Sequence, residues 1–446
     1  MADNIDKGLY QSGQPEFEVL KSDTEVIVDG AQVPVPEGLE IQMDEDGGAT
    51  LDFDPREALP EIEFYSNLAE VIEDRDLDSI SDELMSDFES DKTSRKDWED
   101  AYVNGLSLLG LKYDERTNPF RGASGATHPL LAESATQFQA TAFKELLPSG
   151  GPVRTIIMGD ETPEKYARAG RVQEFMNFQL MNKMEDYTTE YDQMLFYLPL
   201  AGSTFKKVYY DELLERPVSK FVPPEDLVVN YMATDLTSCE RICHVINMSY
   251  NDFRKKQVSG FYKDIEILPS EYQTDDIKRK YDDMDGTRPN YADKVVKLYE
   301  FHTSVDLIDF EDKDDEGEMT GIKIPYIVTI EEGSTKIVGI RRNYEKDDPK
   351  KIRKQYFVHY KFLPGLGFYG FGLIHMIGGL SRTATDILRQ LIDAGTLSNL
   401  PAGFKTRGIK IRDDADPLQP GEFRDIDAPN GDLRNALIPL PYKEPS

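Results

Sequence analysis

Cysteine is almost absent from this chain, which carries only Cys239 and Cys243 in its 446 residues. The two are spaced C-x3-C, and His244 follows the second. A structural zinc ion needs four ligands, and the chain has no second cysteine pair to complete the set. The other histidines are scattered along the sequence: His128, His302, His359 and His375. We therefore predict no metal site, and we interpret the apolar stretch ICHVINM as a strand with buried free thiols.

Long apolar runs and a basic leader are also lacking. Nowhere do about eighteen apolar residues follow one another, the length that a membrane-spanning helix requires. The start, MADNIDKGLY, has neither the basic region nor the apolar run of a secretory signal. These two absences predict a soluble chain that is not exported and does not enter a membrane.

Basic residues are outnumbered by acidic ones. The chain has 51 Lys and Arg against 83 Asp and Glu, which gives a formal net charge of -32. Such a chain repels a phosphate backbone over most of its surface, so broad electrostatic attraction to nucleic acid is excluded as its main mode of binding. Any contact with DNA is therefore expected to be local, confined or weak.

Motifs of nucleotide hydrolysis and acyl transfer are missing, because the chain has no Walker loop and no G-x-S-x-G. One literal G-x-G-x-x-G occurs at Gly365, Gly367 and Gly370, with Asp386 at the distance of a ribose-binding acid. No strand–helix–strand unit surrounds it, Pro364 opens it, and Asp386 falls on an expected helix. The context favours a turn that starts a helix, so we predict no catalytic residue, cofactor or enzymatic activity; a nucleotide-binding enzyme is the weaker alternative.

Residues 127–154 specify a helix and its end. Thr127 is a suitable N-cap, and Pro129 suits the first turn, where no backbone donor is lost. Apolar residues then recur at three- and four-residue spacing: Leu131, Ala135, Phe138, Ala142 and Leu146. The helix is expected to stop before the run Pro148, Gly150, Gly151 and Pro152.

The remaining pattern predicts a mixed chain. The first ninety residues are acidic and turn-rich, so we expect an extended or partly disordered segment. A second helix is expected from Pro163, and a third from 187 to 197, ended by Pro199 and Gly202. Short strands are expected at 204–210, 217–222, 227–231, 294–302, 322–330, 336–340 and 354–363. A short helix is expected within 251–264, whereas 270–293 is charged and poorly patterned.

The amino-acid sequences of several segments resemble those of one protein family. Residues 127–154, THPLLAESATQFQATAFKELLPSGGPVR, resemble a segment of the portal proteins of tailed, in particular short-tailed, bacteriophages. FVPPEDLVVN at 221–230, followed by DLTSCERICH at 235–244, resembles that family's "PEDF-V" strand and the turn after it. Residues 362–402 resemble its glycine turn and long helix, and PLPYKEPS at 439–446 resembles its join into a further helical region. The order of these segments extends the resemblance over residues 95–446.

The resemblance implies an α+β chain with the phage portal fold: a helical and β-rich wing, a β-containing clip and a long stem helix. The implied divisions are an acidic, partly disordered segment at 1–93, a wing-like region at 94–265, a β-rich clip-like region at 266–370 and a stem-like helix at 371–400. Residues 401–446 then form a channel-proximal or wing segment that leads to a crown region beyond the chain.

The stem-like helix is clear from 381 to 398. One apolar face contains the residues that the resemblance places at a subunit interface: Leu380, Ala384, Ile387, Leu388 and Leu391. Arg382 with Asp386, and Arg389 with Asp393, are charge pairs at i,i+4 on another face. The alternative is an ordinary domain helix with surface charge pairs.

Two basic clusters interrupt the acidity. Seven basic residues are expected in a turn between strands, and the resemblance assigns them to docking of the packaging motor and tail adaptor: Arg341, Arg342, Lys346, Lys350, Lys351, Arg353 and Lys354. The second set is assigned to the DNA channel: Arg382 and Arg389 on the helix, then Lys405, Arg407 and Lys410 after it. The alternative for each cluster is a solvated, charged loop.

The function implied by the resemblance is structural. Portal chains form a ring, expected to have twelve copies, at one vertex of the capsid, and double-stranded DNA passes through it during packaging and ejection. The implied partners are other copies of the chain, the terminase, the tail adaptor, the major capsid protein and the DNA, in the virion and, during assembly, in the host cytoplasm. An acidic capsid-associated scaffold without DNA contact is the other alternative.

Overall fold

The computed structural model describes residues 62–399, with gaps at 112, 114, 119, 212–213, 268–275, 286–294 and 314–317. Outside this range it describes only the backbone of short strands: β1 (Glu25–Val28), β2 (Ala31–Pro34), β3 (Glu40–Met43), β4 (Ala49–Asp52), β13 (Gly403–Lys405), β14 (Lys410–Ile411), β15 (Ile426–Asp427) and β16 (Leu437–Pro439). The chain divides into two compact units, residues 1–66 and residues 67–446.

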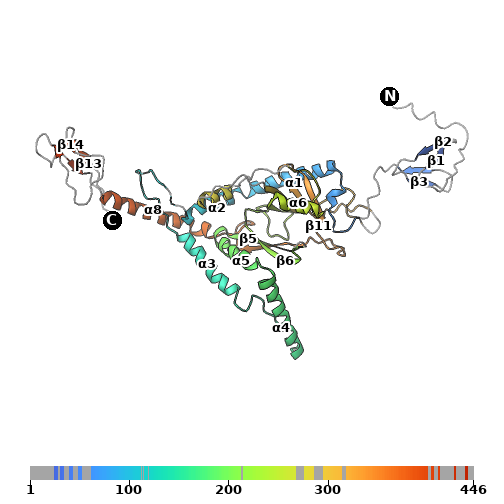
Figure 1. Cartoon of the computed structure of the whole chain (residues 1–446), viewed down its shortest axis with the longest axis horizontal. Helices are drawn as coiled ribbons and strands as arrows, with labels where there is room; N and C mark the ends of the chain where they lie inside the picture. The colour runs from blue at the N-terminus through green and yellow to red at the C-terminus, as the bar shows by residue number, and fades with distance from the viewer. Residues whose placement is uncertain are drawn as a thin grey trace, which may run out of the picture. The chain divides into compact units, whose positions relative to one another are not determined.

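Both helices and antiparallel sheets build the second unit (Figure 1), so the general α+β class is confirmed. Its helical segments are η1 (Leu68–Glu70), α1 (Asp74–Ser94), α2 (Lys96–Leu106), η2 (Ser107–Leu109), α3 (Leu130–Leu146), α4 (Pro163–Phe178), the π-helical turn η3 (Gln179–Lys183), α5 (Tyr187–Ala201), α6 (Tyr250–Val258), α7 (Asp276–Asp285) and α8 (Leu373–Asn399). Its longer sheets are formed by β5 (Ser203–Asp211), β6 (Arg216–Val222), β7 (Leu227–Val228), β8 (Ile242–Ser249), β9 (Val295–Val305), β10 (Ile324–Glu331), β11 (Ile337–Arg342) and β12 (Phe357–Lys361).

Two antiparallel sheets form the centre of this unit. The larger has the strand order β11-β10-β9-β8-β7, and the smaller has the order β12-β5-β6. In the larger sheet Val245 pairs with Tyr299 and Phe301 pairs with Val328. In the smaller sheet Phe205 pairs with both Val222 and His359. The loop from 343 to 356 therefore leads from the edge of one sheet to the edge of the other.

Central strand β9 is covered on both faces. Phe88 of α1 packs on the rings of Tyr299 and Phe301, with centroids 4.5 and 6.3 Å apart. Glu300 and His302 point to the opposite face, where the Lys207 ammonium of β5 contacts the Glu300 carboxylate. Alternation along the strand explains this division, since successive side chains leave a strand on opposite sides.

Asn67, the first residue of the second unit, protects the edge of the larger sheet. The Asn67 side chain accepts a hydrogen bond from the Ile340 amide at 2.9 Å and donates one to the Val338 carbonyl at 3.2 Å. An amide side chain thus pairs with β11 as a neighbouring strand would, which blocks this edge against further strand addition.

Helix α1 and the strand pairing of the larger sheet cross two of the expected divisions. Residues 1–93 were expected to be one poorly ordered segment, but α1 is an ordered helix whose Leu77, Leu84 and Phe88 are buried. Residues 266–370 were expected to form a separate clip-like region, but β9, β10 and β11 continue the sheet begun by β7 and β8, and β12 joins β5. Sequence order misled here because strand pairing connects segments far apart in the chain.

The helix limits also bring corrections. Pro129, not Thr127, is the N-cap position of α3, and it makes no side-chain cap. Pro199 lies inside α5, which ends at Ala201 before the left-handed Gly202. Helix α7 lies in the stretch that showed no clear pattern. By contrast, α4 begins at Pro163 as expected, and the Thr162 side chain caps it by accepting a hydrogen bond from the Lys165 amide.

Both cysteines are free and buried, as predicted. Cys243 lies on β8, but Cys239 lies in the turn before that strand, so the expectation that both belong to the strand is wrong. Burial raises the pKa of both thiols above the ordinary value.

Candidate functional site

Helix α8 exposes large apolar side chains along one face. Met376, Leu380, Ile387 and Leu391 are 57%, 63%, 61% and 57% exposed. Their spacing of four, seven and four residues aligns them on one side of a helix, and we call them the α8 stripe. Single exposed apolar residues are common on soluble proteins, whereas a row of them on one face is typical of a surface that contacts another molecule.

The first turn of α8 buries apolar Ile374 in the core, but from Thr385 to Asp393 the face opposite the stripe is polar and covered by the chain. The Asp393 carboxylate accepts a hydrogen bond from the Ser124 amide at 2.6 Å, and the Thr385 hydroxyl accepts one from the His128 amide at 3.1 Å. Between them, Arg389 donates to the Ala126 carbonyl at 2.7 Å and to the Thr127 hydroxyl at 3.1 Å. Successive turns of α8 thus hold the segment 124–128 by directional contacts.

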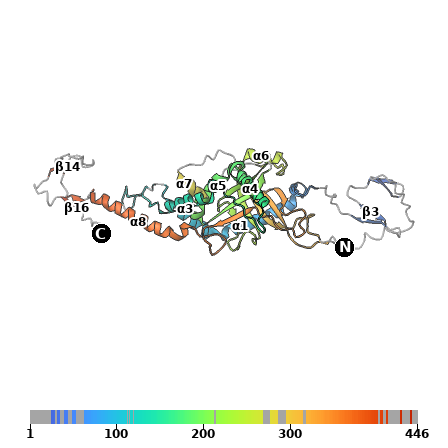
Figure 2. The same cartoon turned by 90° about the horizontal axis from the view of Figure 1, so that it is seen from below.

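These contacts reverse the usual arrangement of an amphipathic helix. A helix at the surface of a globular domain normally buries its apolar side and exposes its polar side. Here the N-terminal turns of α8 pack beside α2 and α3, and both views show the helix continuing away from the sheets (Figure 1 and Figure 2). The polar face from Thr385 to Asp393 is used within the chain, and the apolar face stays exposed.

Some of the predicted interface residues lie on the exposed face of α8, and others lie at its edge. Leu380, Ile387 and Leu391 belong to the α8 stripe, while Ala384 and Leu388 lie half-buried at its margin. Leu388 is therefore a poorer probe of the exposed surface than Ile387.

The predicted channel residues differ in their exposure and contacts. Arg382 is exposed on the flank of α8. Arg389 is half-buried and holds segment 125–127. Lys405 and Lys410 fall on β13 and β14, where only the backbone is described, and Arg407 lies outside the described residues.

The predicted docking cluster is largely occupied by contacts within the chain. Arg341 and Arg342 belong to β11 and not to a turn, which corrects the prediction. The Arg341 guanidinium lies 4.1 Å from the ring centroid of Phe261, and that of Arg342 lies 5.4 Å from the ring of Phe310. These contacts cover the ends of the larger sheet.

The rest of the cluster lies in the loop between β11 and β12. Arg353 donates to the Leu236 carbonyl at 2.7 Å, Lys354 pairs with Glu345 at 3.0 Å, and Lys351 pairs with Asp312. Lys346 and Lys350 are exposed, and within the described part of the chain their ammonium groups make no hydrogen bond or ion pair. Only these two therefore remain free to contact a partner.

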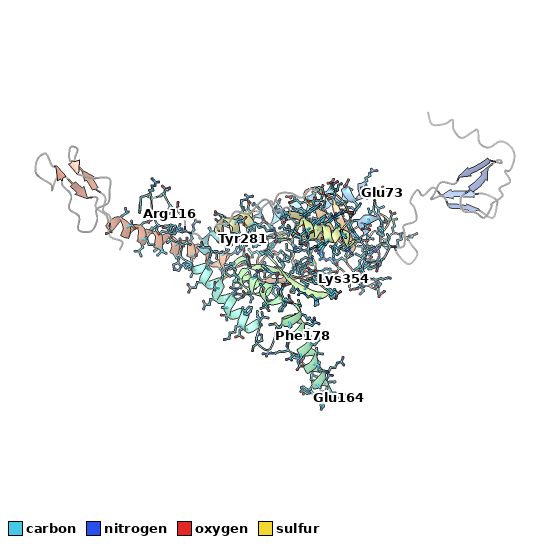
Figure 3. The ribbon with its side chains drawn as sticks, viewed as in Figure 1. Glu73, Arg116, Glu164, Phe178, Tyr281 and Lys354 are labelled. Atoms are coloured by element: carbon cyan, nitrogen blue, oxygen red, sulfur yellow. The ribbon has the colours of Figure 1, made fainter. Side chains whose placement is uncertain are left out.

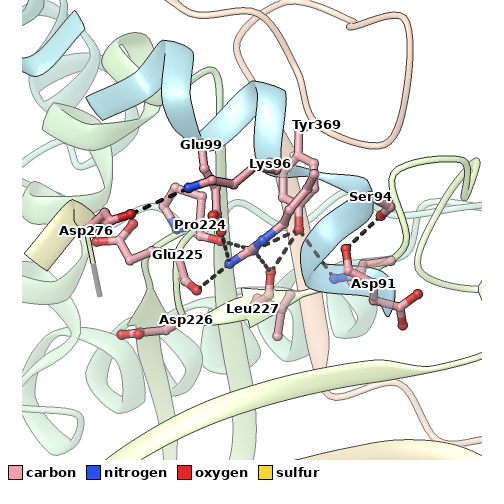
Figure 4. Close-up of polar contacts among 12 residues, drawn as sticks. Asp91, Ser94, Lys96, Glu99, Pro224, Glu225, Asp226, Leu227, Asp276 and Tyr369 are labelled. Atoms are coloured by element: carbon pink, nitrogen blue, oxygen red, sulfur yellow. Dashed lines mark hydrogen bonds and ion pairs between the residues drawn. The ribbon is translucent and has the colours of Figure 1, made fainter. Parts of the chain in front are cut away.

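A buried arginine that the sequence analysis missed joins three parts of the fold. Arg95, between α1 and α2, donates to the carbonyls of Pro224, Glu225 and Leu227, each at 2.9 Å, and to the Tyr369 hydroxyl at 3.0 Å. It also pairs with Glu99 at 2.7 Å. Figure 4 shows these labelled partners converging from a helix, the turn before β7 and the turn before α8. No motif signals this site, because most of its acceptors are backbone carbonyls, which every residue carries.

Beside this arginine lies a buried carboxyl group. Glu225 is 5% exposed, and its Oε2 atom has no hydrogen-bond partner among the described residues. Burial, with Asp226 next to it, raises the pKa of Glu225 to about 7 from its usual 4.5. Asp226 itself pairs with Lys278 of α7 at 2.7 Å.

Replacing this carboxyl group is expected to change the dependence of stability on pH. Because the folded pKa of Glu225 lies above its unfolded value, folding is favoured at low pH, and this stability is lost as the pH rises from 4.5 to 7. Glu225→Gln should therefore raise the free energy of unfolding at pH 8 by about 2–3 kcal/mol and leave it nearly unchanged at pH 4. Denaturant titration at both pH values measures this, with exposed Glu133→Gln as control. An equal effect at both pH values would contradict it.

The glycine turn before α8 is filled by protein atoms. A Cβ on Gly365 would lie 1.9 Å from the Tyr369 carbonyl oxygen, and one on Gly370 would lie 2.4 Å from the Gly202 carbonyl oxygen. A Cβ on Gly367 would lie 2.5 Å from the ring of Tyr231. Close packing of the chain on itself accounts for all three glycines, and Asp386 lies within α8, so the dinucleotide interpretation gains no support from this geometry.

Among the described residues, no group of three or more His, Cys, Asp and Glu side chains is arranged to hold a metal ion. Within that same part of the chain, every helix is too short or too polar to span a bilayer.

No protein-family model matches the chain, and no curated protein matches it.

Proposed function

We propose that this chain is the subunit of a portal-like ring through which double-stranded DNA passes. The observation that carries the proposal is the α8 stripe, an apolar row on a helix whose polar face is already bound within the chain. Burial of apolar surface contributes about 25 cal/mol per Å², so such a row favours a partner surface over water. The order of portal-like segments along residues 95–446 supports the same proposal.

The charge of the chain suits a conduit better than a DNA-binding protein. A ring of twelve copies would carry roughly -380 formal charges, against one phosphate charge per about 1.7 Å of duplex. Repulsion over most of the bore keeps the duplex from adhering to the wall. Local basic residues such as Arg382, exposed on the flank of α8, can guide the DNA without arresting it.

The basic loop supports a narrower docking surface than the sequence suggested. In the proposal, Lys346 and Lys350 contact the terminase or the tail adaptor, because their ammonium groups are exposed and unoccupied within the described part of the chain. Lys351 and Arg353 instead connect the β11–β12 loop to Asp312 and Leu236. Lys354 pairs with Glu345 within the loop, and Arg341 and Arg342 of β11 lie over Phe261 and Phe310.

The test is the size and shape of the purified protein. At micromolar concentration we expect closed rings with a central hole in negative-stain images and a mass that is a whole multiple of the 50.7 kDa chain. Monomers at every concentration would contradict the proposal. Compact oligomers without a hole would favour the acidic scaffold instead.

A further inference from the structure

A second unpartnered surface lies on α4 and the segment before it. No residue of α4 is buried, and Val172, Phe175 and Phe178 are 43%, 62% and 48% exposed. In the extended segment just before it, Ile156 and Met158 are 89% and 90% exposed. We call residues 153–178 the α4 arm; Figure 3 shows the labelled Glu164 and Phe178 toward opposite ends of its helix, away from the sheets.

The arm is nevertheless ordered. The Asn177 side chain accepts a hydrogen bond from the Val153 amide at 2.9 Å and donates to the Val153 carbonyl at 3.2 Å. The Gln173 side chain accepts from the Thr155 amide at 3.3 Å, and the Thr155 hydroxyl donates to the Ala169 carbonyl at 3.2 Å. One face of α4 thus holds the extended segment, and the face with Phe175 and Phe178 stays outside.

The α4 arm and α8 are without net charge in this acidic chain. The arm carries four basic residues and four acidic ones, and α8 carries two of each, so both are neutral in a chain of net charge -32. Helix α1, by contrast, carries eight acidic residues and two basic ones. Two copies of the chain repel each other least where both surfaces are neutral, which favours the arm and α8 as the places where copies meet.

We propose that the α4 arm of one copy packs on the α8 stripe of the next copy; this inference rests on the proposed ring. Both surfaces expose large apolar side chains, belong to segments without net charge and are about four turns long, since α4 has 16 residues and the stripe runs from 376 to 391. They are different surfaces of one chain, so their contact is head-to-tail, the type of interface that closes a ring with more than two copies.

Disulfide trapping tests the pairing without assuming a register. Phe175→Cys is combined in turn with Leu380→Cys, Ile387→Cys or Leu391→Cys, and the assembled protein is mildly oxidised. We expect at least one pair to yield a ladder of covalent multimers on a denaturing gel, because each copy links to the next. Met232→Cys combined with Ile387→Cys is the control, since Met232 is 84% exposed but belongs to neither surface. The native cysteines are buried and should not contribute.

A second variant tests whether the arm is needed for assembly. Phe175→Asp with Phe178→Asp should abolish rings and leave the circular dichroism spectrum unchanged, because these side chains are not buried within the chain. Intact rings in this variant, together with no ladder from any cysteine pair, would overturn the inference and leave the proposed ring standing. Wild-type protein that never forms rings would overturn both.

Discussion

Ile387→Asp and Leu391→Asp are each expected to convert assembled rings into folded monomers. The two side chains are 61% and 57% exposed, so a carboxylate there remains in water in the monomer. In the assembly the same carboxylate would be buried against an apolar surface without a partner, which costs several kcal/mol per subunit. Sedimentation velocity on each variant measures the loss of the large species.

The monomers of these variants should be as stable as the wild-type monomer, within about 0.5 kcal/mol, because exposed positions tolerate substitution. Val258→Asp provides a control, since Val258 is 78% exposed at the end of α6 and lies off the α8 stripe. Rings that persist in both Ile387→Asp and Leu391→Asp would show that α8 does not face a neighbouring copy. Loss of rings in Val258→Asp would show that the effect is one of charge alone.

Arg95→Met is expected to lower the free energy of unfolding by about 3–5 kcal/mol, the cost of removing one member of a buried ion pair. Methionine fills much of the same volume but donates no hydrogen bond. The carbonyls of Pro224 and Leu227 and the carboxylate of Glu99 would then lack a donor that they have in the wild type. Chemical denaturation, followed by far-UV circular dichroism, measures the change.

Lys96→Met is the matched control, because Lys96 is the next residue and its ammonium pairs with Asp100 and Asp276 at half-exposed positions. Surface ion pairs contribute about 0–1 kcal/mol, so this variant should lose at most that amount. Equal losses of unfolding free energy in the two variants would show that burial of the Arg95 contacts adds nothing to stability.

Most strands could be predicted from the sequence, because alternation and apolar runs follow directly from where side chains point in a sheet. The expected strands at 204–210, 217–222 and 294–302 correspond to β5, β6 and β9. Their pairing could not be predicted, since β12 joins β5 across about 150 residues of chain and no local signal records such a partner. For this reason the sequence did not indicate that one sheet contains strands from both the wing-like and the clip-like regions.

The candidate site was half predictable. The apolar row on α8 is visible in the spacing of Leu380, Ile387 and Leu391, but the sequence does not tell which face of the helix the chain itself covers. That choice depends on the hydrogen bonds of Thr385, Arg389 and Asp393 to segment 124–128, which lies more than 250 residues earlier. The contacts of the basic cluster within the chain could not be predicted, because solvated and internally paired cations look alike in a sequence.

The buried polar face of α8 also bears on the entropy of association. A helix held only by apolar contacts can turn about its axis at small cost, whereas donors and acceptors on successive turns of α8 permit one rotation. In the proposed ring, each copy would therefore offer its neighbour a row of side chains whose direction is fixed before the encounter. Little conformational freedom remains to be lost when the copies meet, so more of the contact energy is retained as affinity.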